Sequence, residues 1–456
     1  YLFVFIFLPV SLAGYYLLAG RGKGAAARLW LAAVSLWFYG SFRAVYLLIL
    51  LGSAVFNYGI YLRMEKRRDA DVAGRLWLAF GACGNLALLA YFKYTNFFLE
   101  NLYRLGGKEF TAWKILLPVG ISFFTFQQIS FLADGYRGEI RGCGFLDYLL
   151  YIVYFPKLVE GPLAKHEELL PQFAAIGKNC FDGERFIQGI ALFIMGLLKK
   201  VILADTFGGA VDYGYSNLAL MHGLDAALLV VFYALQLYFD FSGYCDMARG
   251  VSWMFGIELP VNFNSPYKAG DIVDFWKRWH ITLNRFFTKY VYIPLGGNRR
   301  GKWRTYRNLL AVFFLSGIWH GAGWNFILWG MMHGVLYVLT RMWQGRRGAA
   351  CSRRAAGGVR RLAGVAATFL YVSVAWVYFR AESVAQGNEL LVKIFRNDFV
   401  RVNRNLAGYF NLDEFWYVLK VLRLDRWEFG HYILMAVITA GSLLLIFFGK
   451  NAAQAA

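Results

Sequence analysis

The chain contains six histidines, the side chains best suited to proton transfer near neutral pH: His166, His222, His280, His320, His333 and His431. His320 follows the strongly apolar residues 309–319 and precedes Gly321. An ionisable side chain at membrane depth is costly and by default marks a functional site. We therefore take His320 as the first candidate base, against the alternative of a histidine hydrogen-bonded between helices for structure alone.

A second apolar segment holds His333, thirteen residues after His320 and next to Gly334. Small neighbours allow helices to approach closely, so a structural role is the favoured interpretation of His333. His166, His222 and His431 lie in or beside predicted polar connections. No functional role is expected for these three.

The spacing of these residues disfavours metal ligation. A metal-binding motif needs histidines at helix-compatible spacing, such as HxxxH or HExxH. Here gaps of 40 and 13 residues separate His280, His320 and His333. The five cysteines form no CxxC pair: Cys83, Cys143, Cys180, Cys245 and Cys351. The sequence predicts no metal site and no disulfide framework, and it disfavours a di-iron desaturase or a zinc protease.

Signals for covalent catalysis are weak. There is no GxSxG motif, and Ser242 and Cys245 are poor candidates for a nucleophile. Asp240 and Asp246 lie in a long apolar segment. They are expected either to pair with Arg249, Arg278 or Lys200 as a buried network or to line a polar cavity.

The elements that must position these residues are membrane helices. Hydrophobic residues make up 59% of the 456 residues and charged residues only 17%, against about 25% charged in a typical soluble domain. A spanning helix needs about 20 mostly apolar residues. Candidate segments lie near residues 1–19, 29–40, 44–62, 76–98, 114–132, 146–159, 186–204, 224–256, 308–320, 323–342, 362–379 and 432–448. We predict an all-α polytopic membrane protein with about eleven to thirteen transmembrane or re-entrant helices.

Basic residues gather in short connections between these segments. The formal net charge is +20, and the basic clusters lie near residues 21–28, 63–68, 299–307 and 341–361. The positive-inside rule explains such clusters better than nucleic-acid binding does, so these loops are expected to face the cytoplasm. The first segment lacks a basic start and a cleavage site, which favours a retained span over a signal peptide. No soluble domain of useful size is predicted, so residues 1–456 are expected to form a single membrane domain.

Residues 257–297 mix charged and aromatic side chains, including Asp274, Arg278, His280, Trp276 and Trp279. Such a mixture suits amphipathic helices at the membrane interface as well as it suits an active site. Composition alone leaves both interpretations open.

Several motifs in this order resemble the membrane-bound O-acyltransferase family, and most closely its bacterial alginate O-acetylation branch. The first hallmark is Asp274-Phe-Trp-Lys-Arg-Trp-His280, followed by Tyr290-Val-Tyr-Ile-Pro-Leu-Gly-Gly297, and the second is Ser316-Gly-Ile-Trp-His320-Gly-Ala. Supporting stretches include Phe155-Pro-Lys-Leu-Val-Glu-Gly-Pro162 and Tyr238-Phe-Asp-Phe-Ser-Gly-Tyr-Cys-Asp-Met247. The resemblance covers about residues 115–382.

The resemblance implies a ring of membrane helices around a thin central core, with His320 as the essential histidine and His280 as the second motif histidine. A neutral imidazole at His320, kept neutral by burial, would remove the proton of an attacking hydroxyl, which typically contributes ~10² to 10⁴-fold in rate. Hydrogen bonds to the thioester or the oxyanion are expected from His280, Arg278, Trp276 or Trp279. Further expected substrate contacts are Asp240, Ser242, Trp319 and Asn325.

The same resemblance implies acetyl-coenzyme A as the acyl donor and no bound cofactor. The basic residues 299–307 suit the donor's phosphates, although membrane topology explains them equally well. An extracytoplasmic partner protein, a polysaccharide acceptor and a bacterial cytoplasmic (inner) membrane location are expected, with lipid as the surroundings and no nucleic acid. The alternatives are a D-alanyl transferase of the teichoic-acid type, a polytopic transporter and a non-catalytic secretion scaffold.

Overall fold

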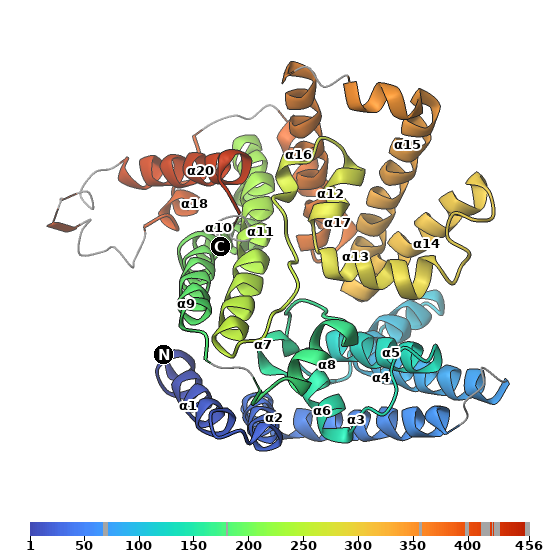
Figure 1. Ribbon diagram of the computed structural model, residues 1–456. Helices are drawn as coiled ribbons and strands as arrows, with labels where there is room; N and C mark the ends of the chain where they lie inside the picture. The colour runs from blue at the N-terminus through green and yellow to red at the C-terminus, as the bar shows by residue number, and fades with distance from the viewer. Residues whose placement is uncertain are drawn as a thin grey trace. The chain divides into compact units, whose positions relative to one another are not determined.

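The computed structural model describes residues 1–66, 72–178, 181–354, 358–396, 401–411, 420–421, 423 and 429–451. Throughout these residues the regular secondary structure is helical and includes no strand, which confirms the predicted all-α polytopic class. Contacts divide the chain into two compact units, drawn in Figure 1 and described here one at a time. Unit 1 is Tyr1–Phe193 with Met247–Pro260, and unit 2 is Ile194–Asp246 with Val261–Ala456. The expected single domain and ring of helices stay predictions.

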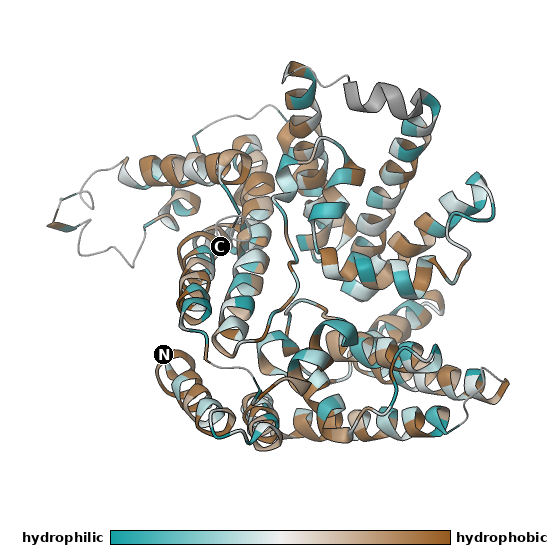
Figure 2. Cartoon of the chain, viewed as in Figure 1, coloured by the Kyte–Doolittle hydropathy of each residue, from teal (hydrophilic) through white to brown (hydrophobic). Residues whose placement is uncertain are grey.

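Six described helical segments are long and apolar enough to cross a membrane. They are Ala44–Glu65 (α3), Val72–Leu105 (α4), Gly183–Ser216 (α9 to α10), Gly223–Met254 (α11), Gly358–Arg380 (α16) and Gly430–Phe448 (α20). Figure 2 shows hydrophobic residues along most of α20 and α3. The other predicted spans match helices that are shorter or more polar, so length and composition alone support about half of the predicted number.

Unit 1 is built from packed helix pairs, with α1 against α2 and α5 against both α3 and α4. Its other elements are η1 (Phe3–Phe7), α1 (Leu8–Ala19), α2 (Gly24–Gly40), α5 (Ile121–Tyr136), α6 (Phe145–Val153), α7 (Phe155–Leu158), α8 (His166–Ala174) and the first part of α9 (Gly183–Leu198). Gly120 has a φ of 70° at the start of α5. A side chain there would be strained, and glycine adopts this angle without cost.

A buried polar network joins three helices of unit 1. Asn57 of α3 and Asn85 of α4 exchange amide hydrogen bonds of 3.2 and 2.6 Å. The Asn57 amide and the Ser53 hydroxyl also donate to Gln128 Oε1 of α5, at 3.0 and 2.7 Å. In lipid there is little hydrophobic attraction between helices, so such bonds and close packing hold them together.

We expect Asn57→Ala to lower the free energy of unfolding by about 1–2 kcal/mol, because the buried Asn85 and Gln128 amides lose partners. Thermal unfolding of the purified protein in detergent measures this loss. Leu48→Ala on the same helix is the control, since Leu48 is 70% exposed in the described structure. Equal melting temperatures for the two variants would contradict the role of the network.

Unit 2 holds the candidate catalytic residues. Its elements are the end of α9, η2 (Lys199–Ala204), α10 (Asp205–Ser216), η3 (Leu218–Leu220), most of α11, η4 (Pro266–Lys268), α12 (Ile272–Arg278), α13 (Ile281–Phe287), η5 (Thr288–Tyr292), α14 (Lys302–His320), α15 (Trp324–Arg354), α16, α17 (Val384–Phe395), α18 (Arg404–Gly408) and α20. Helix α15 packs against α14, α12, α16 and α17. Helix α15 therefore supports the elements that carry the candidate residues His280 and His320.

Candidate functional site

Helices α14 and α15 form an antiparallel hairpin whose backbones touch at glycines. A Cβ atom on Gly317 would lie 2.6 Å from the Phe326 carbonyl oxygen, and one on Gly330 would lie 2.5 Å from the Phe313 carbonyl oxygen. Only glycine permits this approach, which is typical of close helix pairs in membranes. The hairpin turn follows His320 directly, so the contact fixes where His320 lies.

Three aromatic rings surround the imidazole of His320. Its ring centroid lies 4.7 Å from that of Trp319, 5.0 Å from that of Trp329 and 5.0 Å from that of Phe379. Asn325 is buried and donates from Nδ2 to the carbonyl oxygens of Tyr378 and Ala381, at 3.2 and 2.8 Å. Asn325 thus secures the end of α16, which carries Phe379, against α15.

His280 lies in the tight connection between α12 and α13. Helix α12 begins at its cap Asp271, whose side chain accepts from the Asp274 backbone N–H, and ends with two basic residues that suit the helix C-terminus. His280 then takes a left-handed conformation with a φ of 45°. Such a conformation costs a non-glycine residue on the order of 1–3 kcal/mol, and in known structures it is found disproportionately at functional sites.

The imidazole of His280 is almost fully buried, with 2% of the residue exposed. Its Nδ1 lies 3.1 Å from Asn262 Oδ1, and its ring packs edge-on against Phe241 at 4.7 Å. Burial lowers the pKa of His280 to about 3, so the ring is neutral at pH 7. The Trp319 ring lies 6.4 Å from that of His280 and 4.7 Å from that of His320. Both predicted histidines therefore contact one indole.

Trp276 of α12 and Trp279, the C-cap residue of α12, are both buried and pack against other residues of unit 2. Trp276 donates from Nε1 to Nδ1 of His333 at 3.3 Å, and His333 is fully buried. Trp279 is buried against Phe275 and Trp376, with ring centroids 5.6 and 5.0 Å away. The structural role expected for His333 matches this packing, because His333 receives the indole hydrogen bond of Trp276.

The remaining predicted contacts are spread over unit 2. Arg278 forms an ion pair with Asp274 at 2.9 Å, and Asp240 pairs with Lys200 at 2.8 Å, one of its expected partners. Asp246 pairs with Lys199 at 2.6 Å, which is none of the three expected partners. The Ser242 hydroxyl is buried and has no hydrogen-bond partner within the described residues. No described hydrogen bond or ring contact joins Arg278, Asp240 or Ser242 to either histidine.

The sequence interpretation did not identify four residues that contact these two histidines: Phe241, Asn262, Trp329 and Phe379. Asn262 lies 18 residues before His280, and residues 262–264 pair with residues 278–281 through two backbone hydrogen bonds of 2.9 Å. No periodicity reveals such a pairing. The only available signal was the cluster of polar and aromatic residues in this part of the chain.

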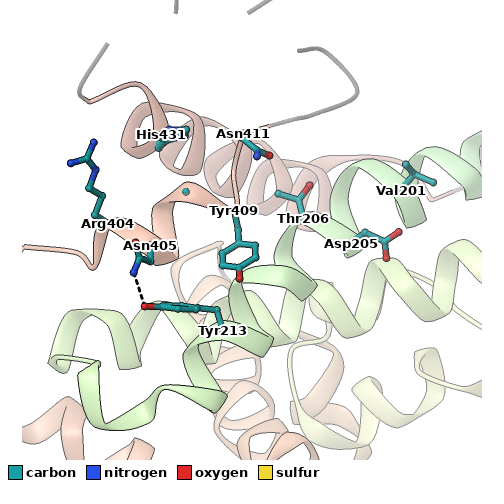
Figure 3. A pocket seen from close by; sticks show the side chains of 10 residues that line it. Val201, Asp205, Thr206, Tyr213, Arg404, Asn405, Tyr409, Asn411 and His431 are labelled. Atoms are coloured by element: carbon teal, nitrogen blue, oxygen red, sulfur yellow. Dashed lines mark hydrogen bonds between the residues drawn. The ribbon is translucent and has the colours of Figure 1, made fainter. Parts of the chain in front are cut away.

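A cavity of about 670 Å³ lies elsewhere in unit 2, and its lining contains neither His280 nor His320. Figure 3 shows its lining side chains, which come from η2, α10, α18, α20 and nearby turns: Val201, Asp205, Thr206, Tyr213, Arg404, Asn405, Gly408, Tyr409, Asn411 and His431. Asn405 donates to the Tyr213 hydroxyl at 3.0 Å. This cavity is therefore separate from the residues that contact the two histidines.

One group of possible metal donors lies in unit 1, among the described residues. Donor atoms of Asp134, Glu139 and His166 lie within 4.8 Å of one another. His166 Nδ1 is 2.9 Å from Asp134 Oδ2, and the Arg137 guanidinium lies 3.6 Å from Asp134 Oδ1. The histidine and the guanidinium account for the position of the Asp134 carboxylate without a cation.

Comparison with known proteins agrees with this arrangement. Residues 92–378 match the model of MBOAT, the membrane-bound O-acyltransferase family. The chain belongs to the membrane-bound O-acyltransferase family. It is an O-acyltransferase embedded in a membrane, and the matched range includes α12 to α15 with His280 and His320.

Curated relatives of this family match most of the chain. A peptidoglycan O-acetyltransferase of Helicobacter pylori is 39% identical over 86% of this chain and 78% of its own length. A probable alginate O-acetylase AlgI of Pseudomonas aeruginosa is 39% identical over 84% of this chain and 71% of its own length. A teichoic acid D-alanyltransferase of Streptococcus thermophilus is 26% identical over 55% of this chain and 63% of its own length.

The glycine contact between α14 and α15 leads to a testable prediction. We expect Gly330→Ala to reduce acyltransferase activity by at least ~10-fold and to lower the melting temperature, because its Cβ meets the Phe313 backbone at 2.5 Å. Gly345→Ala on the same helix is the matched control, since nothing lies within 4 Å of its Cβ. An active and stable Gly330→Ala protein would show that the hairpin tolerates separation.

The depressed pKa of His280 predicts how stability depends on pH. In the unfolded chain this histidine binds a proton below pH ~6.5, whereas in the folded protein it does so only near about 3. The contribution of neutral, buried His280 to the free energy of unfolding is therefore complete above pH ~6.5 and is lost as the pH falls toward about 3. We expect His280→Asn, which tolerates a left-handed backbone, to flatten the fall of melting temperature between pH 7 and 4.5. The exposed His222→Asn is the control, and an unchanged slope in His280→Asn would contradict the buried neutral state.

Proposed function

We propose that this O-acyltransferase moves an acetyl group from acetyl-coenzyme A in the cytoplasm to a hydroxyl of an exported polysaccharide, in the bacterial cytoplasmic membrane. The observation that carries the proposal is the convergence of His280 and His320 on the ring of Trp319. The acetyl group and the polysaccharide acceptor are supported by relatives named for peptidoglycan and alginate O-acetylation.

The distribution of charge supports transfer across the membrane. Helix α14 begins among Lys302, Arg304 and Arg307, and α15 carries Arg341 and Arg346 toward its end. These basic ends of the hairpin face the cytoplasm by the positive-inside rule. His320 lies at the opposite end of α14, about 28 Å away at 1.5 Å per residue, toward the extracytoplasmic side.

His320 is the proposed general base. It removes the proton of the acceptor hydroxyl while the hydroxyl oxygen attacks the thioester carbonyl carbon and forms a tetrahedral oxyanion. Collapse of this intermediate breaks the carbon–sulfur bond, and the coenzyme A thiolate takes the proton back from the His320 imidazolium.

Two of the predicted oxyanion donors already have partners. Trp276 Nε1 donates to His333, and Arg278 Nε donates to Asp274. Trp276 and Arg278 are therefore assigned to holding the α12 segment in place, and the direct contacts to substrate are left to His280 and His320.

A separate extracytoplasmic protein is proposed to receive the acetyl group or to present the polysaccharide. The described connections near His320 are short, with residues 321–323 after α14 and residues 381–383 after α16. Neither connection is long enough to hold a polymer chain by itself. Acetyl-coenzyme A is the proposed donor, and no bound cofactor takes part in the proposed chemistry.

We expect His320→Ala to lower release of coenzyme A from acetyl-coenzyme A by at least ~10²-fold, because the base is lost. The measurement uses purified protein in lipid nanodiscs with an O-deacetylated polysaccharide and a membrane extract as the source of the partner. His222→Ala is the matched control, since His222 is an exposed histidine outside the site.

Three results would argue against this function. Full thioester turnover in a folded His320→Ala protein would remove His320 as the base. Activity with a D-alanyl carrier thioester but none with acetyl-coenzyme A would favour the teichoic-acid type of transfer seen in the more distant relatives' names. No turnover and no donor binding in the intact protein would favour a non-catalytic secretion scaffold.

A further inference from the structure

We propose that Asn262 is a positioning residue that fixes His280 as the Nδ1–H tautomer, so that Nε2 is presented to the substrate as a hydrogen-bond acceptor. This inference rests on the O-acyltransferase reaction proposed above. It assigns to His280 a task different from stabilising the oxyanion, because an unprotonated Nε2 has no hydrogen to donate. It also gives Asn262 a role within the site.

The orientation of the Asn262 amide is determined by its other neighbours. The Thr282 backbone N–H lies 3.2 Å from Asn262 Oδ1, and the Thr282 hydroxyl lies 2.9 Å from the same atom. A backbone N–H can only donate, so the atom that it faces must be the amide oxygen. On the other side, Asn262 Nδ2 points at Cys245 Sγ at 3.3 Å, a weak acceptor. If the amide were rotated by half a turn, Asn262 Nδ2 would face the Thr282 backbone N–H, and two donors would oppose each other.

The tautomer of His280 follows from this orientation. Nδ1 of His280 lies 3.1 Å from Asn262 Oδ1, which has only lone pairs to offer. Nδ1 must therefore carry the hydrogen of the neutral ring. His280 Nε2 then holds a lone pair, and it makes no hydrogen bond to any described residue.

The backbone holds both partners in register. Asn264 N–H donates to the Arg278 carbonyl oxygen, and Ile281 N–H donates to the Asn262 carbonyl oxygen, each at 2.9 Å. These two bonds are made by residues on either side of His280 in the sequence, and His280 itself has a left-handed backbone with a φ of 45°. The rings that face the imidazole are Phe241 and Trp319, at 4.7 and 6.4 Å, and neither is titratable. Cys245 is the titratable side chain recorded at the Asn262 amide.

An acceptor nitrogen in this position suits a substrate group that carries a hydrogen. The group is either the hydroxyl of the acyl acceptor or an amide N–H of the pantetheine arm of coenzyme A. Separate titrations of acceptor and of acetyl-coenzyme A distinguish the two sources. A change confined to the acceptor titration identifies the hydroxyl, and a change confined to the donor titration identifies the amide.

The direct test is ¹⁵N NMR of histidine-labelled protein, which needs no turnover and so stands even if the acetyl reaction is wrong. We expect the resonances that disappear in His280→Asn to show a protonated Nδ1 and an unprotonated Nε2. In Asn262→Leu we expect the Nε2–H tautomer to appear. A protonated Nε2 in the intact protein would overturn the proposal.

Kinetics supply the second test. Asn262→Leu should lower kcat/KM by about 10²-fold. Asn262→Asp should keep most of the activity, because its carboxylate still accepts from Nδ1–H, and it should shift the acid limb of the pH profile upward by favouring the imidazolium. Asn264→Leu is the matched control, since that exposed amide lies two residues away and bonds to Asn451. Equal losses in Asn262→Leu and Asn262→Asp, with an unmoved pH profile, would show that Asn262 only stabilises the fold.

Discussion

The close contact between α14 and α15 is the interaction on which the site depends. Lipid offers little hydrophobic driving force for helix association, so the hairpin must gain stability from van der Waals contact between backbones. Gly317 and Gly330 make this contact possible. Because His320 ends α14 and Trp329 lies on α15, the same contact that joins the helices also sets the 5.0 Å ring separation between His320 and Trp329.

Aromatic packing transmits this constraint to the rest of unit 2. The ring centroid of Trp329 lies 6.0 Å from that of Trp276, whose indole donates to His333. It lies 5.4 Å from the ring centroid of Trp376, which is in turn 5.0 Å from that of Trp279. Rigid rings with few rotatable bonds pack together with little loss of conformational entropy. The short α12 segment is therefore positioned by side chains that come from α15 and α16, and His280 is positioned along with it.

The sequence identified candidate residues from their type, and it missed the neighbours that depend on tertiary pairing. Membrane helices follow from composition and length, and His320 follows from an ionisable residue that ends an apolar segment. The substrate contact expected of Trp276 stays a prediction, whereas the hydrogen bond from its indole to His333, 57 residues away, was not predicted. Asn262 was not singled out within its polar and aromatic cluster, because its contact with His280 arises only when residues 262–264 lie against residues 278–281. The number of spans does not follow from length and composition alone, because α14 and α15 are long helices but are more polar than the six apolar segments.

The two histidines have environments that suit different tasks. A carboxylate next to His280 would favour the imidazolium and bury an ion pair, which is costly away from water. The Asn262 amide oxygen accepts a hydrogen bond without adding charge, and it therefore keeps a buried imidazole neutral and in one orientation. His320 is only partly buried at the end of its helix. A proton gained there is better solvated than one gained at His280, and for this reason the proposed mechanism places the transient positive charge on His320 and the lone pair on His280.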